Sequence, residues 1–239
     1  MSVLVRGSGE KRLDSDFLHW NLAMTTAVES LPENNHDLEV ISLIGFVHGV
    51  SHFFHLLLPP LFPWLMHDFG LSFTGIGATM TIFFVVSAIG QALAGFLVDR
   101  FGAAKVLAGG ISCFLFAALL LSVVDGFLGL TLVAALAGLG NSVFHPADFT
   151  VLNRHVSQHR LAHAFSIHGL SGNLGWALAP VFMTGIAAMA GWRVAALAAA
   201  GLAALALLLV FWRRRTLADP PALLLDDPAG GAGGGGRRC

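Results

Sequence analysis

Three histidines lie within one long apolar stretch in the first quarter of the chain. His48, His52 and His55 are spaced at i, i+4 and i+7, so a helix places them on one face. Imidazole changes its charge near neutral pH, and ionisable groups inside a bilayer are costly and usually face a cavity. We therefore consider these residues candidates for a substrate and proton site. Hydrogen bonds to neighbouring helices are the alternative explanation.

A second polar group follows in two later apolar segments. His145 and Asp148 are spaced at i, i+3 and are preceded by Asn141, while His168 and Asn173 come in the next segment. The Asp148 carboxyl is suited to holding and releasing a proton, or to anchoring the end of a helix near the membrane surface. The sequence leaves both interpretations open.

The 11 histidines also raise the hypothesis of a membrane metalloenzyme, because imidazole binds iron and zinc. A further series, His155, His159 and His163, lies among basic residues and reads as a solvated basic loop. Its predicted side of the membrane is opposite to that of the first series, so the two cannot share one metal. Acidic partners are scarce as well, and we expect no metal, no cofactor and no enzymatic activity.

Membrane-spanning helices are required to position these side chains. The chain has 239 residues, of which 56% are hydrophobic and 11% charged, whereas about a quarter are charged in a soluble domain. The mean hydropathy is +0.76. A span needs about 20 mostly apolar residues. Six segments meet this requirement: 40–66, 73–98, 103–124, 127–152, 163–189 and 193–212.

The basic residues predict the orientation of these spans. If the N-terminus lies in the cytoplasm, every Lys and Arg except Arg193 falls in a cytoplasmic loop or terminus. We therefore expect both termini inside a bacterial inner membrane. Residues 1–39 are interpreted as a disordered cytoplasmic arm, and 213–239 as a basic and then Gly-rich disordered tail. The net charge of −1 does not favour nucleic acid as a partner.

The segment between the second and third predicted spans carries a motif, GFLVDRFGAAK, from Gly95 to Lys105. Gly102 permits a tight turn, Asp99 can cap the third helix, and Arg100 and Lys105 keep the loop in the cytoplasm. The motif resembles the signature of the major facilitator superfamily between its second and third helices. The resemblance implies that Gly95, Asp99, Arg100, Gly102 and Lys105 form a conformational latch that contacts the other half of a transporter.

A second pattern is GLGNSVFHPAD, from Gly138 to Asp148, followed by AFSIHG from Ala164 to Gly169. It is similar to the branch of the superfamily that contains the fosmidomycin-resistance efflux proteins. This resemblance implies an all-α membrane protein, half of a major facilitator fold, with six transmembrane helices in two inverted three-helix repeats. In that fold the first and fourth helices line the central cavity. The residues expected there are His48, His52, His55, Asn141, His145, Asp148, His168 and Asn173.

Two positions depart from the family patterns. Ala134 stands where many drug-proton antiporters carry an Arg, and no acid follows His55, where the fosmidomycin branch often has one. A proton-coupling scheme therefore cannot be transferred unchanged from either group.

The resemblance implies secondary transport, with proton-coupled efflux of a small molecule as the expected activity. The family has twelve spans and this sequence shows six, so we expect an N-terminal half or a truncated chain. A second six-helix half, from the same or another chain, would then be needed for the rocking motion of transport. A non-transporting membrane fragment or interaction subunit is the alternative.

Overall fold

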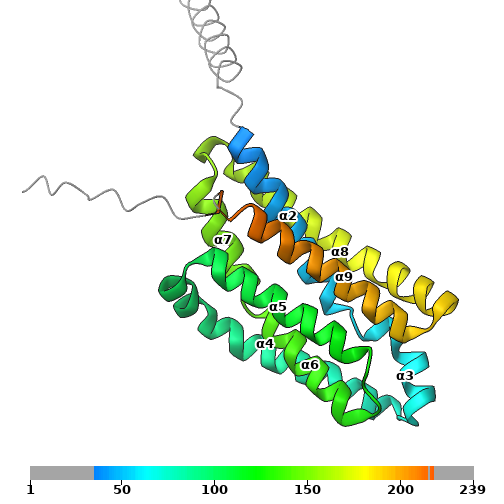
Figure 1. The fold of residues 1–239 in the computed structure, drawn as a ribbon. Coiled ribbons are helices and arrows are strands. Elements are labelled where there is room, and N and C mark those ends of the chain that lie inside the picture. Colours follow the sequence, from blue (N-terminus) through cyan, green and yellow to red (C-terminus); the bar gives the residue numbers. More distant parts are fainter. Residues whose placement is uncertain (1–34, 215, 218–239) are drawn as a thin grey trace, which may run out of the picture. The chain divides into compact units, whose positions relative to one another are not determined.

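The computed structural model describes residues 35–214 together with 216 and 217, and these residues contain helices and turns but no strand. The first span comprises α2 (Asn35–His55), the 3-10 turn η1 (Pro59–Leu61) and α3 (Phe62–Phe69). The next two are α4 (Phe73–Phe101) and α5 (Ala103–Leu121). The fourth comprises α6 (Phe127–Asn141) and α7 (Phe144–His155), the fifth η2 (Gln158–Arg160) and α8 (Leu161–Ala190), and the sixth α9 (Trp192–Trp212). All six are long and apolar enough to cross a membrane, which confirms the predicted all-α fold with six spans (Figure 1).

The six spans form two similar sets of three. In each set the first span is broken in the middle and the second is one long helix of 29 or 30 residues. The third is a shorter helix of 19 or 21 residues. Because each set contains an odd number of spans, the second set enters the membrane from the opposite side. This arrangement is an inverted repeat.

The joints between the second and third spans repeat as well. Gly102 (φ 84, ψ 145) alone separates α4 from α5, and Gly191 (φ 90, ψ 157) alone separates α8 from α9. Both N–H groups close the preceding helix by donating to the carbonyl four residues back, of Val98 and of Ala187. A positive φ of this size favours glycine, because residues with a Cβ are strained there.

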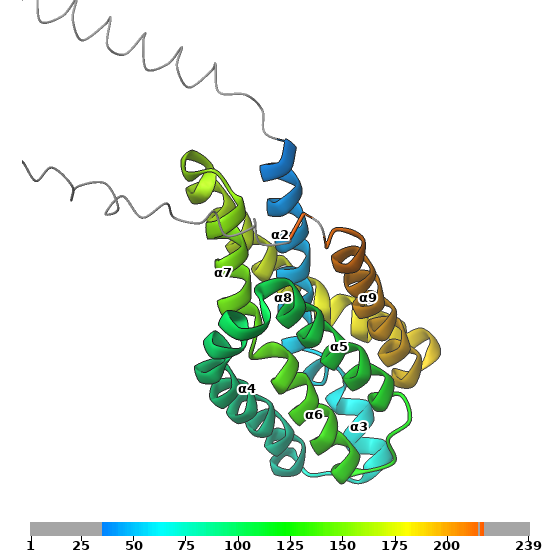
Figure 2. The ribbon, with the colours of Figure 1, turned by 60° about the vertical axis from the view of Figure 1, so that its left-hand side comes forward.

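The packing of the spans follows the same symmetry. The two third spans, α5 and α9, pack against each other, and α4 of the first set packs against α6 of the second. In the equivalent pair, α2 and α8 approach closely where Gly49 and Gly175 meet. Figure 2 shows the α4–α6 and α5–α9 pairs from the side. Small residues allow such backbone approach where the lipid supplies no hydrophobic force between helices.

Prolines explain the two broken spans. Pro59 and Pro60 lack the N–H groups that would extend α2, so its last turns end at His55 and a 3-10 turn follows. Pro146 lies in the first turn of α7 and cannot donate to the carbonyl of Ser142, where α6 has just ended. The predicted fourth span, 127–152, is confirmed as one span over 127–155, which Pro146 divides into α6 and α7.

Several helix ends also differ from the expected bounds. The first helix already begins at Asn35, inside the stretch assigned to the arm, with Asp37 buried and Glu39 paired with Arg213. Residues 67–69, expected in a loop, belong to α3, and Arg154 and His155 belong to α7. Residues 1–34, 215 and 218–239 lie outside the described part, so most of the predicted arm and tail stays a prediction.

Candidate functional site

The two broken spans meet at their interruptions. His55 is the last residue of α2 and Asn141 the last of α6, and the imidazole Nε2 of His55 hydrogen-bonds the Asn141 amide oxygen. The breaks therefore bring the polar end of one helix against the polar end of the other, deep within the bundle. Interrupted helices at this depth commonly mark a binding site in secondary transporters.

Asp148 is the buried centre of the site. Its side chain is fully buried, and one oxygen, Oδ2, accepts from Nδ1 of His48 at 3.0 Å and from Nε2 of His168 at 3.1 Å. The two imidazole rings stack with centroids 3.5 Å apart. One carboxylate oxygen of Asp148, on α7, thus joins α2 and α8 through hydrogen bonds with His48 and His168.

A directed chain of hydrogen bonds crosses the site beside this centre. The indole Nε1–H of Trp176 donates to Nδ1 of His55 at 3.2 Å. The acceptor role of Nδ1 leaves the proton of the neutral ring on Nε2, which donates to Asn141. The Asn141 amide in turn donates to the Ser87 hydroxyl at 2.7 Å. Four helices, α8, α2, α6 and α4, are linked in that order.

Polar atoms of two histidines, His52 and His145, and the second carboxylate oxygen of Asp148 form no hydrogen bond within the described residues. The ring of His52 lies 4.9 Å from that of His55 and 4.5 Å from the Trp176 ring, centroid to centroid. Both of its nitrogens are buried with no hydrogen-bond partner among the described residues, and so is Oδ1 of Asp148. His145 is half-buried, with its ring 5.3 Å from that of His48. Buried polar atoms without hydrogen-bond partners destabilise the folded state, so these atoms could bind a polar substrate.

The geometry also bears on the metal hypothesis. His48, His145 and His168 each place a potential ligand nitrogen within 4.8 Å of the others. Ligand nitrogens in a tetrahedral zinc site lie about 3.3 Å apart, given zinc–nitrogen bonds of about 2.05 Å. Because 4.8 Å is the outer limit of these separations, the three histidines stay a candidate ligand set for one ion. In the later series, His155 ends α7, His159 lies in η2 and His163 lies in the first turn of α8, and none of them belongs to this group.

The structure brings together seven of the eight residues proposed for the cavity. Asn173 forms no hydrogen bond with the other seven within the described residues and is exposed on α8, as Trp176 is, so its place in the cavity stays a prediction. Sequence reasoning missed Ser87 and Trp176. Trp176 follows His168 by just over two helical turns, and the need of an indole N–H for a partner could have singled it out. Ser87 gave no comparable signal within its apolar helix.

The predicted latch residues lie at one joint. Gly95, Asp99 and Arg100 belong to the C-terminal part of α4, Gly102 is the joint, and Lys105 lies in the first turns of α5. The expected capping of the third helix by Asp99 is wrong, because Asp99 is still helical and the cap residue of α5 is Gly102, without a side-chain cap. The role of these residues as a latch stays a prediction.

Six apolar helices in inverted repeats, with a polar cluster at the breaks of the first and fourth spans, define a multi-pass membrane bundle. The profile of the Major Facilitator Superfamily matches residues 41–230, and the chain belongs to this family.

Named relatives agree with this assignment. The chain is 31% identical over 152 residues to the fosmidomycin resistance protein of Escherichia coli K12, covering 64% of this chain and 37% of that protein. It is 30% identical over 126 residues to a multidrug resistance protein B homolog of Mycobacterium tuberculosis H37Rv, covering 53% and 23%. The chain thus spans little more than a third of the length of the first of these relatives.

Solved structures share the fold. The peptide transporter POT in complex with sulfate superposes with a TM-score of 0.68 at 20% identity, covering 74% of this chain and 38% of that one. A POT family transporter in complex with 5-aminolevulinic acid gives a TM-score of 0.64 at 18% identity over the same shares. At this level of identity the likeness concerns the fold alone.

Proposed function

We propose that this protein takes part in proton-coupled efflux of a small molecule across a bacterial cell membrane, by transport and not by catalysis. It would act as one six-helix half, with its termini in the cytoplasm, opposite a second half supplied by the same or another chain. The efflux-type relatives support the direction, and the fosmidomycin resistance protein suggests fosmidomycin as the first compound to test.

The observation that carries the proton proposal is the Asp148 carboxyl, fully buried and bonded by His48 and His168. A lone buried carboxylate in a membrane domain is expensive, and gaining one proton within the three-residue group removes its net charge. The three groups belong to three different helices. A proton that arrives or leaves therefore changes how strongly α2, α7 and α8 hold one another, which is the kind of link that alternating access requires.

The substrate would bind beside this group. His52, His145 and Trp176 offer ring faces, and the two ring nitrogens of His52 have no hydrogen-bond partner within residues 35–214. In the proposed mechanism the six-helix half rocks against the other half around this midplane site. The joint formed by Asp99, Arg100 and Gly102 would make and break contacts with the second half.

Replacement of Asp148 by Asn tests the proposal. Asn keeps the size of the side chain but cannot take up or release the proton. We expect fosmidomycin accumulation in drug-sensitive bacteria expressing Asp148→Asn to rise to the level of cells without the protein, at unchanged membrane expression. Asp125→Asn, an exposed acid in the loop after α5, should export like the original chain.

The outcomes separate the alternatives. Full export by the Asp148→Asn variant would refute the proton role of this carboxyl. No export by the original chain, despite normal insertion, would instead favour an interaction subunit. Proton release measured in proteoliposomes on addition of drug then decides whether export and proton movement are linked.

A further inference from the structure

A recess whose described lining contains none of the histidines of the site lies on another side of α5 and α6. It is a groove of about 420 Å³ between the C-terminal part of α4, the first half of α5 and the end of α6. Leu97, Phe101 and Leu139 form exposed apolar walls, and Lys105 is the one charged residue of its described lining. A groove with apolar walls and one cation favours an occupant that has an apolar part and one anionic group.

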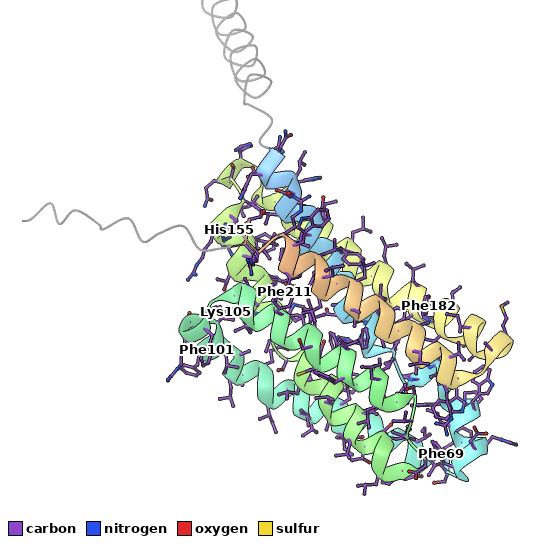
Figure 3. All side chains as sticks on the ribbon, in the orientation of Figure 1. Phe69, Phe101, Lys105, His155, Phe182 and Phe211 are labelled. Atoms are coloured by element: carbon purple, nitrogen blue, oxygen red, sulfur yellow. The ribbon has the colours of Figure 1, made fainter. Side chains whose placement is uncertain are left out.

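The groove runs along the helix axis from the membrane surface inward. Lys105, Gly109 and Cys113 line it at i, i+4 and i+8 of α5, so they share one face over about 12 Å. The apolar layer of one bilayer leaflet is about 15 Å thick. Figure 3 shows Lys105 beside Phe101 at one end of the bundle, with Phe69 at the other end. The groove thus matches one leaflet in depth, with its cation at the surface end.

Other charges at this rim do not cancel the cation. Arg100 lies over the ring of Phe101, with its guanidinium carbon 5.6 Å from the ring centroid. Asp99 is the acidic neighbour in the same turn of α4, and both are exposed. The rim therefore carries two positive charges and one negative charge. Such a surplus attracts the phosphate of an anionic lipid at this depth.

Neighbouring glycines on α5 serve different purposes. A Cβ built on Gly110 would lie 2.9 Å from the carbonyl oxygen of Gly140, so Gly110 allows α5 and α6 to pack. A Cβ on Gly109 would meet no atom within 4 Å, although this glycine lines the groove. Helix packing therefore does not explain Gly109, which instead keeps the floor of the groove open.

We propose that this groove binds one anionic phospholipid, with its phosphate at Lys105 and an acyl chain lying over Gly109 toward Cys113. A bulk lipid would contact any exposed apolar face. This site instead combines a recess, a depth of one leaflet and a cation at the correct end.

Native mass spectrometry of the full chain tests the site, with phosphatidylglycerol and phosphatidylcholine of identical acyl chains as probes. We expect one phosphatidylglycerol retained per chain with about fivefold preference, the effect of one lysine near a membrane surface. Lys105→Gln should remove the preference and Lys105→Arg should keep it. Gly109→Leu fills the groove and should reduce retention of both lipids. Gly201→Leu, the same change at another open glycine, should leave retention unchanged.

Unchanged lipid preference in Lys105→Gln, or unchanged retention in Gly109→Leu, would overturn the proposal. Thermal unfolding of each variant identifies any loss of folding, and Leu has a better helix propensity than Gly. Asp148→Asn should retain the lipid like the original chain. The lipid site and the proton proposal can therefore fail independently.

Discussion

At the scale of residues, the site is organised by hydrogen-bond direction. Trp176 can only donate, so Nδ1 of His55 must accept, and this decides the role of every group down to Ser87. Asp148, in contrast, only accepts when ionised, and two imidazoles donate to the same oxygen. The two networks lie side by side and are joined through the ring contacts of His52 with His48 and His55.

A double-mutant cycle tests whether the directed chain acts as one unit. Trp176→Phe removes the first donor and keeps a ring beside His52, while Asn141→Leu removes the third member. Because both changes break the same network, we expect their effects on unfolding free energy in detergent to be non-additive by about 0.5–1.5 kcal/mol.

The matched control combines Asn141→Leu with Trp212→Phe, since the Trp212 side chain is 72% exposed at the end of α9. That pair should be additive. Additivity in the Trp176 pair as well would mean that the two hydrogen bonds are independent.

At the scale of helices, much of the architecture was readable in the sequence and part was not. Apolar runs of sufficient length predicted six spans, because lipid requires them to be apolar around most of their circumference. The i, i+4, i+7 spacing correctly predicted that His48, His52 and His55 share a face. The break at Pro146 follows from its missing N–H, whereas the partnership of Ser87 with Asn141 depends on how the helices pack.

Close helix contact at Gly138 gives a prediction for an element. A Cβ on Gly138 would lie 2.5 Å from the carbonyl oxygen of Phe83, a backbone atom that cannot move away easily. We expect Gly138→Ala to separate α4 from α6 and to destabilise the protein by about 1–3 kcal/mol, as overpacking does. Thermal unfolding in detergent measures the effect.

Gly77→Ala is the matched control, because Gly77 lies in α4, the other helix of this contact, and a Cβ there would meet nothing within 4 Å. Its unfolding midpoint should be equal or higher, given the better helix propensity of Ala. Equal midpoints for Gly138→Ala and the original chain would show that the α4–α6 contact is less close than described.

At the scale of the whole molecule, the orientation in the membrane is a prediction from the basic loops. It can be tested with single cysteines in a chain carrying Cys113→Ser and Cys239→Ser. His159→Cys and Asp125→Cys each place a thiol at an exposed position, in loops that an odd number of spans separates. In intact cells an impermeant maleimide should label position 125 and not 159, and disruption of the membrane should expose 159. The reverse pattern would invert the predicted topology.

The chain from Trp176 to Ser87 has one further consequence. Each of its inner members receives on one side and gives on the other, so none of them can turn around alone without setting two donors or two acceptors face to face. A guest that accepted a hydrogen bond from Nδ1 of His55 would require the ring proton on that nitrogen, so Nε2 would become an acceptor and the Asn141 amide would have to turn its NH2 toward it. The change would reach all four linked helices together. The network would then have two complete hydrogen-bond arrangements and no stable intermediate one.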